Sequence, residues 1–326
     1  MARHILSIAD LTASDIAGIV RRSVSISANE VDPSDSLTGR VIGIYFRKTS
    51  TRTRTSFSVG AARLGATTIA YGPHDLQTNT GETIQDTARV LAGYLDALVI
   101  RTAEDIEEMK TLAAQGEMSV INAMSENEHP TQALADLSTI AEHFGQTEAI
   151  EVLYMGEGNN TASALALAFS RVRTAKVTIL TPPEYGLPNQ ILRQAQALAR
   201  EYGAEIKQHH SIDALPDKVD VVYTTRWQTT GTSKADPNWR DAFQQFRVSR
   251  AVMEKVSKPG RTIFMHDLPA VRGEEVDAEV IDGPQSIAFR QSRHKLFSAM
   301  AALEWVVSAK PLFAKKSSPA RVAVDA

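Results

Sequence analysis

Short apolar runs alternate with amphipathic segments along most of this chain. The runs predict β-strands at residues 41–46, 67–71, 97–101, 119–122, 151–155, 176–180, 205–208, 220–224 and 262–266. Between them, apolar residues recur at helical spacing over residues 52–65, 83–94, 104–114, 131–144, 161–172, 188–202 and 248–257. Strands that alternate with helices are typical of βαβ units. The pattern therefore predicts an α/β fold built from doubly wound parallel sheets.

Two domains suit this number of strands better than one very wide sheet. The break is expected near Gly145, after a helix that starts at Pro130, where the missing N–H of proline costs nothing. We predict a first domain over residues 1–145 and a second over residues 146–290. A last helix over residues 291–309 is expected to pack back on the first domain. The Pro-, Ser- and Lys-containing tail, 310–326, is expected to be mobile and solvated.

Composition removes several classes of function. The 326 residues carry a net charge of −3 and are 43% hydrophobic and 22% charged, so nothing indicates nucleic-acid or anionic membrane binding. There is no cysteine, which excludes disulfides, thiolate metal sites and a cysteine nucleophile. No apolar run is long enough to span a membrane, and the N-terminus lacks the apolar core of a signal peptide. A cytoplasmic protein is expected.

The turn between the first strand and the next helix is the strongest chemical signal. Ser50, Thr51, Arg52, Thr53 and Arg54 follow the apolar run 41–46 directly. Free backbone N–H groups and the dipole at a helix start favour an anion, and hydroxyls and guanidinium groups add further hydrogen bonds. The turn predicts a phosphate site. Taken alone, it could also be a surface arginine cluster.

Two further positions favour the phosphate site. Arg101 ends the strand 97–101, and the carboxyl ends of parallel strands are where α/β sheets bind ligands. His129-Pro130-Thr131-Gln132 stands at a loop-to-helix junction, where polar donors can reach a ligand carbonyl. Instead of binding a ligand, Arg101 could form a salt bridge at the rim of the sheet, and His129 could have a purely structural role.

These side chains are hydrogen-bond donors without an accompanying nucleophile. No Ser-His-Asp order and no metal-ligand spacing competes with them. Such a site suits a reaction in which the substrates supply nucleophile and leaving group, while the protein positions them and stabilises a developing oxyanion. Neither a metal nor a cofactor is therefore expected. Gly156 and Gly158 could begin a dinucleotide fingerprint, but Thr161 holds the third glycine position.

These motifs, together with the segment from Met265 to Val276, resemble the aspartate/ornithine carbamoyltransferase family. The resemblance runs from about residue 5 to residue 309. It implies a first domain that binds carbamoyl phosphate and a second that binds the acceptor amino acid. It also implies a homotrimer, or an assembly of several trimers, with sites between subunits.

The resemblance also implies roles for individual residues. Ser50, Thr51, Arg52, Thr53 and Arg101 would bind the phosphate. Thr53, Arg101 and His129 would polarise the carbamoyl oxygen, while Gln132 and the Leu268 carbonyl would hold the carbamoyl NH₂ group. Lys295 stands where the family has an arginine, so the charge is kept but the bidentate fork is lost.

The acceptor side departs from the family pattern. Thr225 stands where ornithine-type enzymes have an aspartate, whereas Arg226 and Gln228 match the Thr-Arg-x-Gln of aspartate-type enzymes; Thr229 follows in the same segment. Asp267 replaces the cysteine of the ornithine-type His-Cys-Leu-Pro and could receive the amine or remove its proton. Asn160 matches the asparagine directed at the substrate carboxylate.

Three readings of the acceptor stay open. The preferred one is ornithine or a related diamino acid, including a shorter one such as 2,3-diaminopropionate. The second is an aspartate-type acceptor, against which the loop 75–82 argues because it lacks the lysine that aspartate-type enzymes contribute to a neighbouring subunit. The third is a non-catalytic homologue that only binds carbamoyl phosphate or an amino acid.

Overall fold

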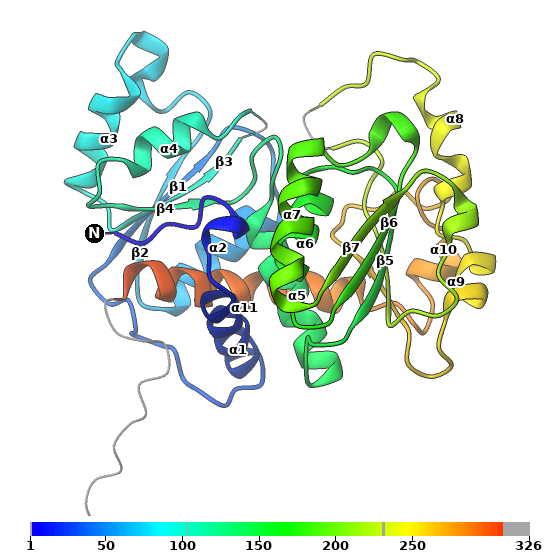
Figure 1. The fold of residues 1–326 in the computed structure, drawn as a ribbon. Coiled ribbons are helices and arrows are strands. Elements are labelled where there is room, and N and C mark those ends of the chain that lie inside the picture. Colours follow the sequence, from blue (N-terminus) through cyan, green and yellow to red (C-terminus); the bar gives the residue numbers. More distant parts are fainter. Residues whose placement is uncertain (1, 103, 230–231, 309–326) are drawn as a thin grey trace, which may run out of the picture.

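A computed structural model describes residues 2–102, 104–229 and 232–308. Its first half contains a parallel sheet of four strands in the order β2-β1-β3-β4 (Figure 1). The strands are β1 (Val41–Phe46), β2 (Thr67–Tyr71), β3 (Ala97–Arg101) and β4 (Ser119–Asn122). β1 and β3 are buried almost throughout, whereas residues 67–70 of the edge strand β2 are exposed.

The second half contains a parallel sheet of five strands in the order β7-β6-β5-β8-β9. They are β5 (Glu151–Met155), β6 (Lys176–Leu180), β7 (Glu205–His209), β8 (Val221–Thr224) and β9 (Ile263–His266). All nine predicted strands are present, and their ends differ from the prediction by at most one residue. The predicted α/β class with two parallel sheets is confirmed.

Helices connect the strands and cover the sheets. They are α1 (Ala13–Ser27), α2 (Arg52–Arg63), α3 (Ile84–Ala92), α4 (Glu107–Ala113), α5 (Pro130–Phe144), α6 (Asn160–Phe169), α7 (Asn189–Tyr202), α8 (Trp239–Phe243), α9 (Arg250–Val256), α10 (Ala278–Ile281) and α11 (Ala288–Val307). Helix α1 was not predicted from the sequence, although Thr12 and Asp15 form a capping box that marks its start. The short helices α8 and α10 were not predicted either.

Two helices form the seam between the sheets. Every residue of α6 is buried, and α5 is buried from Pro130 to Ile140. A helix that is apolar or small on all sides requires neighbours on all sides, and here α5 and α6 pack against each other. The backbone N–H of His129 donates to the carbonyl of Asn160 at 3.1 Å. The N-termini of both helices therefore meet at one point.

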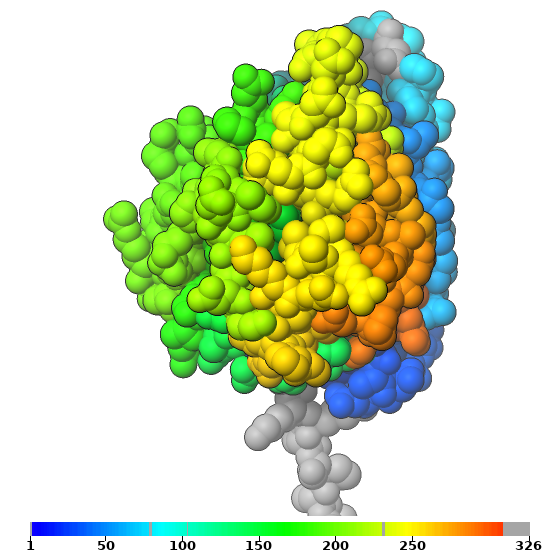
Figure 2. Space-filling model, turned by 90° about the vertical axis from the view of Figure 1, so that its right-hand side faces the viewer, coloured from blue at the N-terminus to red at the C-terminus, as the bar shows by residue number. Residues whose placement is uncertain are grey.

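The last helix joins the two halves. α11 packs against α1, α2 and α5, and also reaches β9 of the second sheet, as its course beneath both sheets shows (Figure 1). It begins at Ala288, three residues earlier than predicted. Viewed from the side of the second sheet, the surface consists mostly of segments from the second half of the chain (Figure 2). The domain limits at residues 145 and 290 stay a prediction, and the tail 310–326 lies outside the described residues.

Among the described residues, no helix combines the length and the apolar character needed to cross a membrane.

Candidate active site

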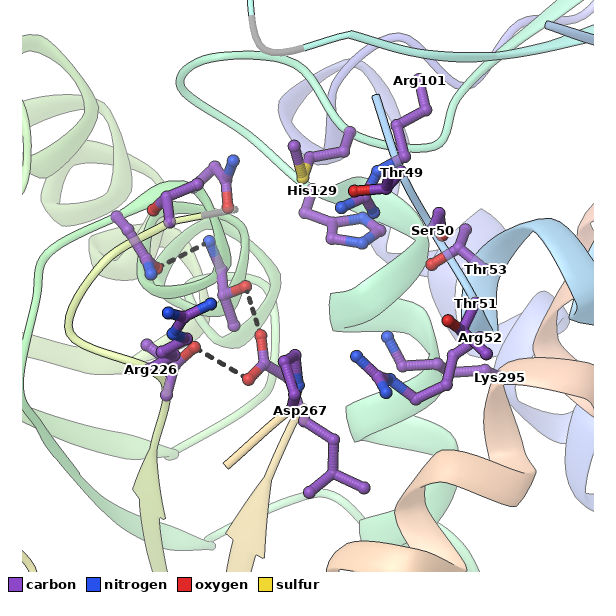
Figure 3. A pocket seen from close by; sticks show the side chains of 18 of the residues that line it. Thr49, Ser50, Thr51, Arg52, Thr53, Arg101, His129, Arg226, Asp267 and Lys295 are labelled. Carbon is purple, nitrogen blue, oxygen red and sulfur yellow. Dashed lines mark hydrogen bonds between the residues drawn. The ribbon is translucent and has the colours of Figure 1, made fainter. Parts of the chain in front are cut away.

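A cavity of about 260 Å³ lies where the carboxyl ends of both sheets face each other across the α5–α6 seam (Figure 3). Parallel sheets bind ligands at this edge because loops and helix N-termini gather there. The lining side chains come from the start of α2, the end of β3, the starts of α5 and α6, the loops after β8 and β9, and α11. They include Ser50, Thr51, Arg52, Thr53, Arg101, His129, Asn160, Thr225, Arg226, Gln228, Thr229, Asp267, Leu268 and Lys295.

The phosphate turn opens α2 as the sequence predicts. Thr51 is the N-cap residue, but its side chain accepts no hydrogen bond from the first turn of α2. The backbone N–H groups of this turn can therefore bind other partners. Arg52 lines the cavity, and burial lowers its pKa although Asp267 opposes the shift. Arg54 differs: its side chain is exposed and does not line the cavity.

Arg101 is buried at the end of β3 with an unused donor. Its side chain is 8% exposed, and its Nε has no hydrogen-bond partner. Burial and the charge of Arg52 lower the pKa of Arg101 to about 10, so the guanidinium is still charged at neutral pH. A buried cation with an unsatisfied donor is costly unless an anion binds it. This arrangement indicates an anion site.

Lys295 adds a third cation from α11. It is 8% exposed, and its ammonium group donates to Oε1 of Gln132. Nε2 of Gln132 donates to Oδ1 of the buried Asp136 at 2.8 Å. Burial lowers the pKa of Lys295, and the charges of Arg52 and Arg101 add to this shift. Gln132 is 1% exposed and, like Arg54, does not line the cavity; it lies behind Lys295.

His129 contributes a neutral imidazole. Its Nδ1 lies 3.3 Å from Oγ1 of Thr131. Burial and the charges of Lys295 and Arg101 lower the pKa of His129 well below its ordinary value. The ring can therefore donate a hydrogen bond to a carbonyl oxygen at neutral pH without a charge of its own.

A carboxylate faces these cations from the second sheet. Asp267 follows β9, and its side chain is 14% exposed. Oγ1 of Thr225 donates to its Oδ1 at 2.8 Å, and Oγ1 of Thr161 donates to its Oδ2 at 2.9 Å. Among the described residues that line the cavity, Asp267 is the one carboxylate.

The backbone after β9 is fixed by a buried histidine. Nδ1 of His266 accepts a hydrogen bond from the N–H of Leu268 at 2.8 Å, so its Nε2 carries the proton. That nitrogen lies 3.2 Å from Oε1 of Glu275, which is fully buried. Leu268 has a φ of 57°, a left-handed conformation that is rare for leucine. The surrounding bonds hold Asp267 and Leu268 at the cavity.

The remaining acceptor-side residues lie on the same wall. Arg226 is half-buried and lines the cavity. Nδ2 of Asn160 donates to the carbonyl of Ser125 at 3.0 Å, and Nε2 of Gln228 donates to the carbonyl of Thr232 at 2.8 Å. Oγ1 of Thr229 lies 3.4 Å from Oε2 of Glu157.

Five lining residues were not among the predicted site residues, namely Thr49, Met124, Asn159, Thr161 and Pro269. Met124 lies before the His129 motif, and Thr161 was considered only as a glycine replacement. Thr161 directly follows the start of α6 at the carboxyl end of β5, where ligands of α/β sheets bind. The position of Thr161 in the sequence could therefore have identified it as a lining residue, whereas no sequence feature marks Met124.

Family models match both halves of the chain. Residues 3–142 match the carbamoyl-P binding domain of aspartate/ornithine carbamoyltransferase, and residues 148–306 match its Asp/Orn binding domain. The fold and the cavity are thus those of a two-part transferase with a donor side and an acceptor side. The chain belongs to the aspartate/ornithine carbamoyltransferase family, and it is a carbamoyltransferase.

Similar proteins cover nearly the whole chain. An ornithine carbamoyltransferase of Bacillus cereus is 36% identical over 303 residues, with 92% of this chain and 93% of the relative aligned. One from Oceanobacillus iheyensis is 37% identical over 305 residues, with the same coverage. The solved ornithine carbamoyltransferase of Pyrococcus furiosus gives a TM-score of 0.87 at 35% identity and covers 95% of this chain and 98% of its own.

Proposed function

We propose that this enzyme transfers the carbamoyl group of carbamoyl phosphate to an amino group of ornithine or a related diamino acid. The observation that carries the proposal is the division of the cavity. Three cationic side chains, Arg52, Arg101 and Lys295, line one side, and Asp267 faces them from the other (Figure 3). The first side suits a phosphate dianion, and the second suits a protonated amine.

On the donor side, Ser50, the start of α2 and the two arginines would bind the phosphate oxygens. His129, Thr53 and Arg101 would donate to the carbamoyl oxygen, where negative charge develops as the amine attacks. Each such donor is worth about a 10²- to 10³-fold rate effect in comparable oxyanion sites. Lys295 donates to the side-chain oxygen of Gln132 and lies between this amide and the cavity. Gln132 would therefore hold the carbamoyl NH₂ group only together with Lys295.

The reaction needs a group that accepts a proton from the amine, and Asp267 can be that group. A protonated amine must lose one proton before its lone pair can attack, and the Asp267 carboxylate can accept that proton. The new C–N bond then forms as the C–O bond to phosphate breaks. The departing phosphate takes the second amine proton and leaves as hydrogen phosphate, and Asp267 returns its proton to water. Carbamoyl phosphate and an alkylammonium thus give a ureido amino acid, hydrogen phosphate and one proton.

The acceptor's carboxylate would bind Arg226 and Asn160, which lie on the same wall as Asp267. Relatives named ornithine carbamoyltransferase support ornithine as the acceptor. The replacement of the expected aspartate by Thr225 supports a related, shorter diamino acid such as 2,3-diaminopropionate. An aspartate-type acceptor is favoured only by Arg226 and Gln228.

An acceptor panel tests the proposal. The purified enzyme is given carbamoyl phosphate with L-ornithine, L-2,3-diaminopropionate, putrescine or L-aspartate, and ureido product and phosphate are measured. We expect turnover with a diamino acid and little with putrescine, which lacks a carboxylate for Arg226. Turnover of aspartate alone would contradict the diamino-acid acceptor. Binding of carbamoyl phosphate without turnover of any amine would instead support a binding protein.

We also propose that the enzyme is a homotrimer that associates through its first half. Residues 67–70 of the edge strand β2 are exposed, and so are the large apolar side chains of Val59, Ile69, Val90 and Tyr94. Exposed apolar side chains and an uncovered edge strand favour association. Light scattering should give three times the chain mass of 35.5 kDa. Ile69→Lys should lower that mass, whereas a monomeric wild-type enzyme would contradict the assembly.

A further inference from the structure

We infer that Thr161 and Thr225 are positioning residues that hold Asp267 and, with it, form an acceptor-only receptor for the reacting primary amine. The inference rests on the proposed function and adds residues to it. It assigns Thr225 an indirect role at the position where the family's ornithine-type members carry an aspartate, and it assigns a role to Thr161 that the sequence did not suggest.

Strand register places two of the three residues together. Thr224 of β8 pairs with His266 of β9, so Thr225 and Asp267 are the next residues along two neighbouring strands. Thr161 comes from a third element, the first turn of α6, which follows β5, the other neighbour of β8. Residues from two other elements thus converge on the Asp267 carboxylate, and a side chain bound from two sides loses its freedom to rotate.

The chemistry of the three groups fixes the direction of their protons. An ionised carboxylate only accepts hydrogen bonds, so both hydroxyl protons are directed at Asp267. Each threonine oxygen then has only lone pairs left for another partner. The group therefore offers acceptors and no side-chain donors. An ammonium group, which has three N–H donors and no acceptor, is complementary to it, whereas a carboxylate is not.

The start of α6 stabilises the negative charge of the Asp267 carboxylate. Thr161 is the second residue of the ten-residue helix α6, so Asp267 lies at the positive end of that helix dipole. The carboxylate is held in place while Arg52, Arg101 and Lys295 lie across the cavity. An amine bound against the cavity-facing side of the two hydroxyls and Asp267 would keep its N–H groups on the second-sheet side. Its lone pair, once a proton is lost, would be directed toward the carbamoyl group.

Paired substitutions at each threonine test the inference. Thr161→Val and Thr225→Val remove the hydroxyl and keep the shape, whereas Thr161→Ser and Thr225→Ser keep the hydroxyl. With L-ornithine or L-2,3-diaminopropionate as acceptor, we expect kcat/KM to fall about 10-fold or more in the valine variants and to stay within about threefold in the serine variants. Inorganic phosphate should bind all four as tightly as it binds the wild type.

A matched control and a double-mutant cycle separate positioning from folding. Thr139→Val removes a buried hydroxyl that bonds only within α5, to the Ala135 carbonyl, and should leave turnover unchanged. In an Asp267→Ala background, either valine substitution should cost less than about twofold further, because the threonines act through that carboxylate.

Three results would overturn the inference. They are unchanged kcat/KM in both valine variants, equal losses in the serine and valine variants, and loss of phosphate binding together with turnover. Absence of turnover by the wild type with every amine would overturn the proposed function itself, and the positioning role with it. Wild-type turnover with unaffected valine variants would overturn only the positioning role.

Discussion

Lys295 and Gln132 are joined through the interior of the molecule, since the lysine ammonium donates to the glutamine side-chain oxygen. Lys295 belongs to α11 and Gln132 to α5, and Gln132 continues the chain of bonds to Asp136. Lysine is a shorter and more compact cation than the arginine expected here from the family pattern. It lines the cavity and at the same time fixes the amide behind it.

The Lys295 side chain should therefore contribute strongly to donor binding. We expect Lys295→Met to weaken carbamoyl phosphate binding about 10- to 100-fold, since a hydrogen bond to a charged group is lost and the Gln132 amide is released. Lys295→Arg should bind at least as tightly as the wild type. Titration calorimetry with carbamoyl phosphate measures both, and Lys176→Met, which changes an exposed lysine of β6, is the control. Equal affinities for the Met and Arg variants would contradict a role for the charge.

Asp267→Asn should separate acceptor chemistry from donor binding. We expect kcat/KM for the amine to fall about 100-fold or more, because the amide cannot take the proton. Phosphate binding should stay equal or become tighter, because a negative charge near Arg52, Arg101 and Lys295 is removed. Steady-state kinetics and phosphate titration measure the two effects. If Asp267→Asn and Thr225→Ala cost equally little activity, Asp267 has no role at the amine.

The ion pair between Lys234 and Glu157 should support the acceptor wall. It is largely buried, and the Lys234 ammonium lies 4.4 Å from the centre of the Tyr185 ring. Glu157 also lies beside Thr229, which lines the cavity. Lys234→Met keeps the apolar stem but leaves the carboxylate without its partner, so we expect a roughly 5- to 10-fold higher KM for the amine.

The donor substrate should not be affected by this change. We therefore expect the KM for carbamoyl phosphate of Lys234→Met to match that of the wild type. Lys218→Met, which alters an exposed lysine between β7 and β8, serves as the control. A rise in the KM of both substrates would show that the pair supports the fold in general.

A partly buried cluster of charged and polar side chains between α5 and α11 should make the free energy of unfolding depend on pH in acid. Burial alone would raise the pKa of Glu142, but hydrogen bonds from Ser27, His294 and Arg290 lower it to about 2. Burial lowers the pKa of His294, although Glu142 opposes the shift. Nδ1 of the same histidine lies 2.7 Å from Oγ of the buried Ser138.

The pKa shifts of Glu142 and His294 both lower the stability of the protein as the pH falls. A carboxylate with a lowered folded pKa stabilises the protein above its unfolded value and loses this contribution as the pH falls toward about 2. A histidine with a lowered folded pKa destabilises the protein as the pH falls below its unfolded value of about 6.5. Urea midpoints of the wild type should therefore decrease on acidification. The difference from Glu142→Gln should shrink between about pH 5 and about pH 2, while Glu201→Gln on exposed α7 should follow the wild type.

Local periodicity was sufficient for most of the fold. All nine strands and most of the helices between them follow from apolar spacing, because burying one face of a strand or helix requires that spacing. Helix α1 was not predicted, although a capping box of Thr12 and Asp15 marks its start, and α8 and α10 are too short to show a helical period. The helix start at Arg52 and the strand end at Arg101 could be placed because both lie at boundaries of periodic segments.

The sequence by itself determined the two parallel sheets, the family and most of the residues that line the cavity. Only the tertiary structure decided which of them touch. It placed Gln132 behind Lys295, moved Arg54 out to the surface, and brought Thr161 and Thr225 onto Asp267. The physical reason is that motif spacing fixes the element on which a residue lies, whereas strand order and helix packing fix its neighbours. The pairing of β8 with β9 is a long-range contact that no local pattern encodes.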